Sequence, residues 1–140
     1  MRVSTPDGRV LMAAYRIDGE EVGGIADLFE QFNREFMRDE DWRMGTSLDA
    51  LNDVLHRLDA ESRDGDPAVV VWHDHARSRE VLGFETTQRW LLDKLAQPHA
   101  FDEARIMSDL DALRAGTGKT YFDLVLEVFA GHPHIELQLR

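Results

Sequence analysis

Residues 45–58 read GTSLDALNDVLHRL, and the rest of the chain is best interpreted from this stretch. At about 100° per residue, its aliphatic side chains fall on one side of a helix. Those residues are Leu48, Leu51, Val54, Leu55 and Leu58. Asp49, Asn52, Asp53 and His56 fall on the other side. The pattern predicts an amphipathic helix that packs onto a core through its leucines and turns a polar face outward.

The start of this helix carries its own signals. Ser47 suits the N-cap, because its hydroxyl can accept an amide proton that the first turn leaves without a partner. Asp49 lies in the first turn, where the helix dipole favours a negative charge. Asp53 lies one turn further along, and like charges at this spacing cost a helix about 0.2–0.5 kcal/mol. The two carboxylates either face a positively charged partner or simply form a solvated polar face.

Length and composition indicate one globular domain that spans residues 1–140. The chain is 43% hydrophobic and 31% charged, and 140 residues suffice for a sizeable core. It has no cysteine, no run of apolar residues long enough to span a bilayer, and no signal-peptide pattern at its start. We therefore expect a cytoplasmic protein that does not interact with membranes.

The charge balance is strongly acidic. Asp and Glu number 27 against 16 Lys and Arg, which gives a formal net charge of −11. A nucleic-acid binder needs a basic footprint, so direct binding to nucleic acid is disfavoured. The charge suits a basic protein partner, because complementary fields accelerate encounter. Solubility alone also explains an acidic composition.

Hydrophobic periodicity predicts strands that alternate with helices. Strands are expected at 10–17, 68–72 and 134–139, and helices at 25–38, 76–82, 87–96, 102–115 and 117–130. Residues 59–67 read as an acidic linker, and a turn at 6–8 allows a small N-terminal hairpin. Strands separated by helices require crossover connections, so the sheet should be mainly parallel with three central strands.

The same stretch resembles the barstar family, intracellular inhibitors of a secreted bacterial ribonuclease. The family pattern is a loop glycine followed by Asn-Leu-Asp-Ala-Leu-Trp-Asp. The matching residues here are Gly45, Leu48, Asp49, Ala50, Leu51 and Asp53, with Ser47 replacing Asn and Asn52 replacing Trp. Residues 15–19, 70–72 and 135–139 are similar to family strands. The resemblance covers 12–82 and 119–140, and it implies an α/β fold with an extra helical insertion around 84–118.

The resemblance also implies a partner-binding site. Asp49 and Asp53 would meet the cationic groups of the partner's active site in place of substrate phosphates, and Asn52 and His56 would complete the helix face. The flank would be the preceding loop and N-cap, formed by Trp42, Arg43, Met44, Gly45, Thr46 and Ser47. The chain departs from the family where an aromatic residue usually precedes the loop glycine, and the further acidic contact of the last helix falls nearest Gly131.

These expectations describe an immunity protein rather than an enzyme. It would neutralise a cognate secreted toxin, a ribonuclease with a basic active site, as a monomer that forms a 1:1 heterodimer. No cofactor and no metal are expected. The alternative from a different class is an acidic interaction module, such as a regulatory subunit with a non-nuclease partner.

Three other chemistries are weaker. Residues 116–120 read GTGKT, but a phosphate-binding loop needs a glycine where Leu113 stands. The pairs His73/His75 and His132/His134 have spacings that can suit zinc, although no thiolate accompanies them. Acid–base catalysis by Asp49 and Asp53 would require a pocket that separates their pKa values, and an exposed helix face does not suggest one.

Overall fold

The computed structural model describes residues 2–4, 10–62, 67–97 and 99–140. Its elements, in chain order, are β1 (Arg2–Ser4), β2 (Val10–Asp18), the 3-10 turn η1 (Gly19–Glu21), α1 (Ile25–Phe36), α2 (Leu48–Ser62), β3 (Ala68–His73), α3 (His75–Val81), α4 (Phe84–Leu95), α5 (Glu103–Arg114), α6 (Tyr121–Ala130) and β4 (Ile135–Leu139). No helix in the described ranges is long and apolar enough to cross a membrane.

The strands form one sheet in the order β1-β2-β3-β4. The pairs β2–β3 and β3–β4 are parallel, with Tyr15 opposite Val70 and Val70 opposite Leu137. The three-stranded parallel sheet with helical crossovers is therefore confirmed. β1 pairs with β2 in the antiparallel sense, as an N-terminal hairpin requires, and the expected turn at 6–8 lies outside the described residues.

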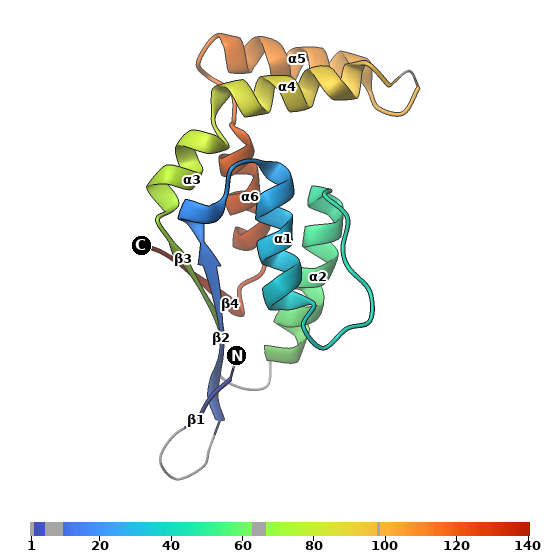
Figure 1. Cartoon of the computed structure of the whole chain (residues 1–140). Helices are drawn as coiled ribbons and strands as arrows, with labels where there is room; N and C mark the ends of the chain where they lie inside the picture. The colour runs from blue at the N-terminus through green and yellow to red at the C-terminus, as the bar shows by residue number, and fades with distance from the viewer. Residues whose placement is uncertain (1, 5–9, 63–66, 98) are drawn as a thin grey trace.

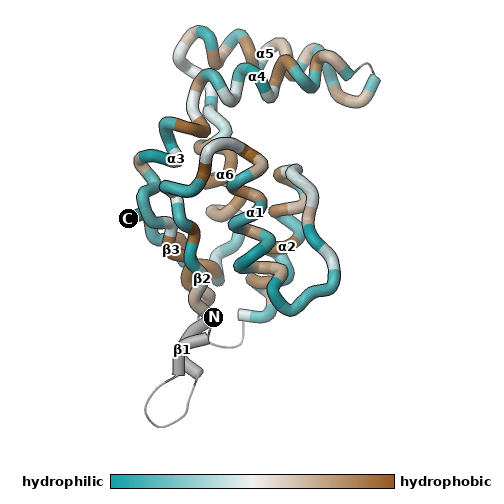
Figure 2. The backbone as a smooth tube through the Cα atoms, viewed as in Figure 1, coloured by the Kyte–Doolittle hydropathy of each residue, from teal (hydrophilic) through white to brown (hydrophobic). Residues whose placement is uncertain are grey.

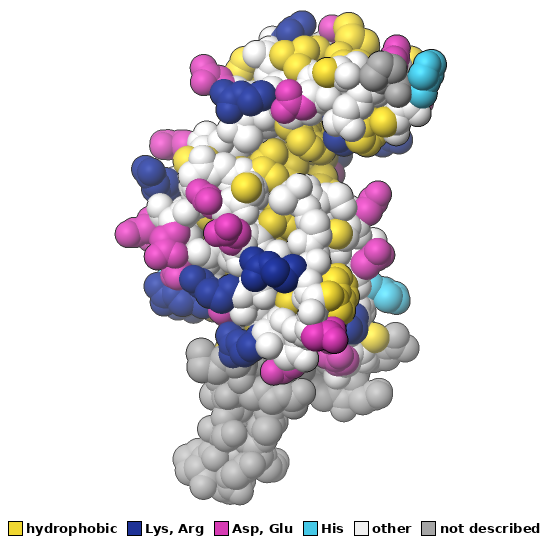
Figure 3. Space-filling view, turned by 45° about the vertical axis from the view of Figure 1, so that its right-hand side comes forward, with side chains coloured by type: hydrophobic (Ala, Val, Ile, Leu, Met, Phe, Trp, Pro, Cys, Tyr) yellow, Lys and Arg dark blue, Asp and Glu magenta, His cyan; other side chains and the backbone are white. Residues whose placement is uncertain are grey.

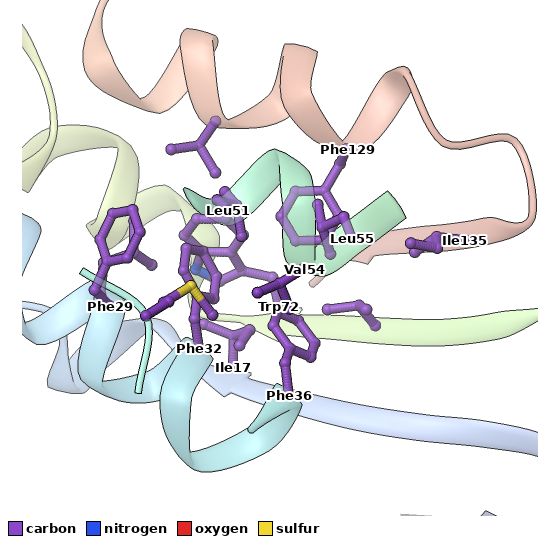
Figure 4. Close-up of a cluster of buried hydrophobic side chains, with 14 of the residues drawn as sticks. Ile17, Phe29, Phe32, Phe36, Leu51, Val54, Leu55, Trp72, Phe129 and Ile135 are labelled. Carbon is purple, nitrogen blue, oxygen red and sulfur yellow. The ribbon is translucent and has the colours of Figure 1, made fainter. Parts of the chain in front are cut away.

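The main core lies between the sheet and helices α1, α2 and α6, which pack on the same side of it (Figure 1). The side chain of Phe32 is fully buried, and its ring centroid lies 5.3 Å from Phe29, 5.6 Å from Phe36, 6.1 Å from Phe129 and 6.4 Å from Trp72. Figure 4 shows these rings converging from different elements. The aromatic stripe on α1 is thus core, as its helical spacing predicts.

The C-terminal ends of β2 and β3 approach each other closely at Gly19. A Cβ atom at Gly19 would overlap the carbonyl oxygens of His73 and Asp74. The same close approach lets the Ser78 hydroxyl donate to the Gly19 carbonyl while it accepts from Trp72 Nε1 at 3.0 Å. This chain of hydrogen bonds fixes η1, β3 and α3 relative to one another.

Helices α4 and α5 form a hairpin that stands apart from the main core (Figure 1). Hydrophobic and hydrophilic residues alternate along both helices (Figure 2). The hairpin has its own small cluster of buried side chains, formed by Leu91, Ile106, Leu110 and Leu113. Its main links to the body lie near α6, where Thr87 Oγ1 accepts from the Tyr121 amide at 2.7 Å and the Trp90 and Tyr121 rings meet edge-on at 5.0 Å. This hairpin is the extra helical insertion that we expected.

Several predicted boundaries were wrong by a few residues. α1 ends at Phe36 rather than 38, and α4 begins at Phe84 rather than 87. α2 extends into the predicted linker as far as Ser62, whose hydroxyl donates to the Leu58 carbonyl. Local side-chain bonds of this kind set helix ends more precisely than periodicity does.

Residues 116–120 end one helix and begin the next. The amides of Thr117 and Gly116 bond to the carbonyls of Ala112 and Leu113, and Gly116 has a φ of +79°. This is a Schellman motif, which closes α5 with a left-handed glycine. Thr120 then caps α6 through a capping box with Asp123. The GTGKT stretch therefore connects two helices, and α6 begins at Tyr121 rather than 117.

Candidate partner-binding site

The outer face of α2 has the composition that its sequence predicts. Ser47 is the N-cap, because its Oγ accepts from the Ala50 amide at 3.0 Å. The buried side chains are Leu51, Val54, Leu55 and Leu58, and Leu48 is half-buried. The exposed side chains are Asp49, Asn52, Asp53 and His56. Core packing thus orients the helix and leaves its polar face toward solvent.

Asp49 and Asp53 have no side-chain hydrogen bond or ion pair within the described part of the chain. Other acidic residues of the same helix do have partners. Asp59 accepts from the His134 amide at 2.7 Å, and Glu61 lies 3.9 Å from Arg57. The unpaired carboxylates are therefore confined to the N-terminal half of α2.

Asn52 is held by a residue from the far end of the chain. The His132 Nε2–H donates to Asn52 Oδ1 at 2.9 Å, and the His132 side chain is only 6% exposed. The ring of His56 lies 6.3 Å from that of His132. Because Oδ1 accepts from within the fold, the Asn52 amide group keeps its N–H donors for groups outside the chain. Sequence reasoning considered His132 only in a possible zinc pair and missed its contact with Asn52, since only the tertiary fold brings the loop after α6 beside α2.

The loop before α2 presents most of the residues predicted for it. Arg43, Gly45 and Thr46 are exposed, and Trp42 is 51% exposed. Met44 is the exception, and its expected place on the surface was wrong. Its side chain is 5% exposed and belongs to the main core, so it anchors the loop.

Asn33 of α1 holds this loop through two side-chain hydrogen bonds to Met44, which we call the Asn33 clasp. Its Oδ1 accepts from the Met44 amide at 2.8 Å, and its Nδ2 donates to the Met44 carbonyl at 3.1 Å. Both bonds are buried, so they satisfy main-chain groups that water cannot reach. No pattern in the sequence predicts this clasp, because Asn33 is simply one more polar residue in a helix.

Arg57 fixes the other end of the loop. Its guanidinium donates to the Phe36 carbonyl at 3.0 Å and forms an ion pair with Glu40 at 2.9 Å. A single side chain of α2 thereby holds both the C-terminus of α1 and the first residues of the loop. The segment between the two helices is tied to the body on both sides.

Gly45 is not required by the fold. A Cβ atom built there would meet nothing within 4 Å, and the residue does not have a positive φ. Because glycine has no side chain, another molecule can approach the backbone closely at this position.

A comparison with models of protein families matches residues 12–108 to the family described as Barstar (barnase inhibitor). The matched range exceeds half of the chain. The chain belongs to the barstar family. A search of curated proteins found no match.

The barstar match takes in the elements that build the candidate site. It runs from β2 through α1, the loop, α2, β3, α3 and α4, and it ends within α5. The family description is that of an inhibitor, which fits a protein without catalytic activity of its own. It also implies that a ribonuclease is the type of partner.

Three of the four paired histidines of this barstar-family chain, His75, His132 and His134, take part in internal hydrogen bonds through their rings. The Nδ1 atom of His75 lies 2.9 Å from the Arg140 carbonyl oxygen, and His134 Nδ1 lies 3.3 Å from Asp59 Oδ1. Partial burial raises the pKa of Asp59. The hydrogen bonds from His134 and its charge together lower this pKa by more, so it lies below the usual value for an aspartate. In the described residues, no three His, Cys, Asp or Glu side chains are grouped so as to hold a metal ion.

Proposed function

We propose that the chain is an immunity protein that neutralises a cognate secreted ribonuclease toxin. The N-terminal face of α2 and the loop before it would occupy the toxin's basic active site in a 1:1 complex. Asp49 and Asp53 would take the place of substrate phosphates, because a carboxylate offers Arg and Lys the same kind of oxygen acceptor. Trp42, Arg43, Gly45 and Thr46 would flank them.

The observation that carries this proposal is the state of the two carboxylates. They are exposed one turn apart on a helix whose other face is fully packed, and the described residues offer them no ion pair. They therefore enter a complex without first breaking a hydrogen bond or ion pair in the described part of their own chain. The net charge of −11 adds long-range attraction to a basic partner.

Asn52 and Gly45 add support from either side of the carboxylates. Asn52 directs free amide donors outward because His132 occupies its oxygen. Gly45 leaves open backbone two residues before the N-cap Ser47, where a Cβ would meet nothing within 4 Å. A partner could thus approach the backbone closely and find both donors and acceptors.

The test is co-expression of the chain with a candidate ribonuclease toxin from the same organism. Cells should grow only when the chain is present, and the purified pair should lose RNA cleavage at an equimolar ratio. Cleavage that persists with excess chain would refute the proposal and favour a regulatory partner of another class.

Single variants then locate the contact. Asp53→Ala, and less severely Asp49→Ala, should weaken binding by about 2–5 kcal/mol while leaving the melting temperature nearly unchanged. Glu80→Ala is the matched control, because Glu80 is an exposed carboxylate on α3, on the other side of the molecule from α2 (Figure 1). Equal affinities in all three variants would exclude α2 from the interface.

A further inference from the structure

A groove of about 640 Å³ separates the α4–α5 hairpin from α2 and α6. Figure 3 shows the hollow between hairpin and body, with hydrophobic side chains at its floor. The hairpin contributes Trp90, Lys94, Phe101 and Asp109 to its lining, and Asp49 lines it from α2. The groove is thus continuous with the helix face assigned above to the partner.

Lys94 lies in an unusual environment within this groove. Its Nζ atom is 3.9 Å from the centre of the Trp90 ring and 5.1 Å from that of Phe101. Burial lowers the pKa of Lys94 below its usual value, and the charges of Asp49 and Asp109 oppose this shift without reversing it. Lys94 forms no ion pair with either carboxylate in the described structure. Aromatic faces and nearby acids attract a cation to this niche, whereas burial penalises a strongly hydrated ammonium.

We infer that this niche, formed by Trp90, Phe101, Asp49 and Asp109, is a docking subsite for an arginine side chain on a loop of the partner. In the free chain the Lys94 ammonium occupies it. The identification of this partner as the toxin rests on the proposed function. The affinity of the niche for an arginine side chain does not rest on it.

Arginine suits the niche better than the resident lysine. A guanidinium is planar and more weakly hydrated than an ammonium, so it loses less on desolvation and stacks on aromatic rings. Lys94 has a long flexible stem and no ion pair in the described structure to hold it, so it can withdraw when arginine enters.

The groove is also large enough for more than one side chain. Volumes of about 300–1,000 Å³ accommodate whole small-molecule ligands, and 640 Å³ falls in that range. A short loop can therefore lie between the hairpin and α2 and place one cation in the niche and another near Asp53. The hairpin would then select among basic partners that all satisfy the carboxylates of α2.

The first experiment needs no toxin. The ¹⁵N-labelled full chain is titrated with the peptide Ac-Gly-Arg-Gly-NH2, and Ac-Gly-Gln-Gly-NH2 serves as the neutral control. The indole N–H signal of Trp90 should shift saturably with the arginine peptide only. The indole of Trp42, which is exposed on the loop, reports binding outside the niche.

Variants at Lys94 test whether the niche is occupied by its own lysine. Lys94→Gln should tighten arginine-peptide binding about threefold, because it removes the competitor. Arg89→Gln makes the same change of charge at an exposed position on the same helix outside the groove. Equal effects of the two variants would overturn the inference, since they would show only a change in overall charge.

Variants at the acids test the niche itself. Asp109→Asn should weaken peptide binding about threefold, whereas Asp111→Asn, an exposed residue of α5 outside the groove, should leave it nearly unchanged. A response at Trp42 instead of Trp90, or no difference between the two acids, would refute the subsite. A chain that binds the peptide at Trp90 but fails to protect cells would refute only the proposed toxin-neutralising function.

Discussion

The body of the molecule and the α4–α5 hairpin are stabilised in different ways. The body packs aromatic and aliphatic side chains from the sheet and three helices into one large core. The hairpin relies on four buried side chains of its own and meets the body mainly around Tyr121. Regions with small cores unfold locally at a lower free energy than global unfolding requires. The chain therefore combines a rigid base with a more easily opened arm that faces the candidate site.

The largest effect should distinguish the two cores directly. Phe32→Ala removes a fully buried ring from the centre of the body and should lower the free energy of unfolding by about 3–5 kcal/mol. Leu110→Ala, in the hairpin, should instead abolish amide protection in α4 and α5 and leave the body's protection intact. Urea unfolding combined with hydrogen exchange measures both. Equal loss of protection everywhere would show that the two regions unfold together.

A smaller effect should appear at the clasp between α1 and the loop. Asn33→Ala leaves the Met44 amide and carbonyl buried without their partners, which should cost about 1–3 kcal/mol. Amides of the loop should exchange faster, while those of the hairpin should not change. Asp53→Ala serves as the control, because the Asp53 side chain is exposed and has no hydrogen bond or ion pair in the described part of the chain. Loss of protection in the hairpin would mean that loop and hairpin are coupled.

The junction between body and hairpin offers a gain in stability. The Tyr121 hydroxyl is buried without a hydrogen-bond partner in the described structure, and the ring packs against Trp90. Tyr121→Phe should raise the free energy of unfolding by about 1 kcal/mol, because it removes an unsatisfied polar group and keeps the ring. Thermal melts at pH 7 would show it. A destabilised variant would imply that an unseen partner, such as a water molecule, satisfies the hydroxyl.

The smallest effect is a pH dependence that belongs to the body. The hydrogen bond from Arg16 lowers the pKa of Asp18, and its other interactions with Arg16 and Arg34 act in the same direction against partial burial. A carboxyl with a lowered folded-state pKa stabilises the protein above its unfolded value, near 3.8, and this contribution is lost as pH falls through the folded value. Asp18→Asn should therefore reduce the melting temperature at pH 7 but not at pH 2. An equal difference at both pH values would contradict this account.

The sequence predicted the fold because its strongest patterns are local. The spacing of Phe29, Phe32 and Phe36 identifies the buried face of α1, and Ser47 marks the start of α2. Helix ends were less predictable, since they depend on individual bonds such as the one from Ser62 to Leu58. The parallel pairing of the three central strands followed from the alternation of strands and helices.

The candidate site was predictable only in part, for a physical reason. The exposure of Asp49 and Asp53 follows from helical periodicity. The burial of Met44, the clasp by Asn33 and the contact from His132 all depend on residues distant in sequence. The niche around Lys94 likewise needs α2 and the hairpin to face one another. Periodicity describes a face of one element, and a site is built where several elements meet.

The Asn33 clasp has a consequence for association. A loop already fixed at Met44 surrenders little conformational entropy when a partner closes over it, so more of the contact energy remains as affinity. Such a loop should accept a matching surface almost as a rigid body, and mismatched surfaces would gain nothing from its adjustment. The chain would then discriminate between partners through the rigidity of this loop. That rigidity comes from Asn33, a buried residue that a partner would not touch.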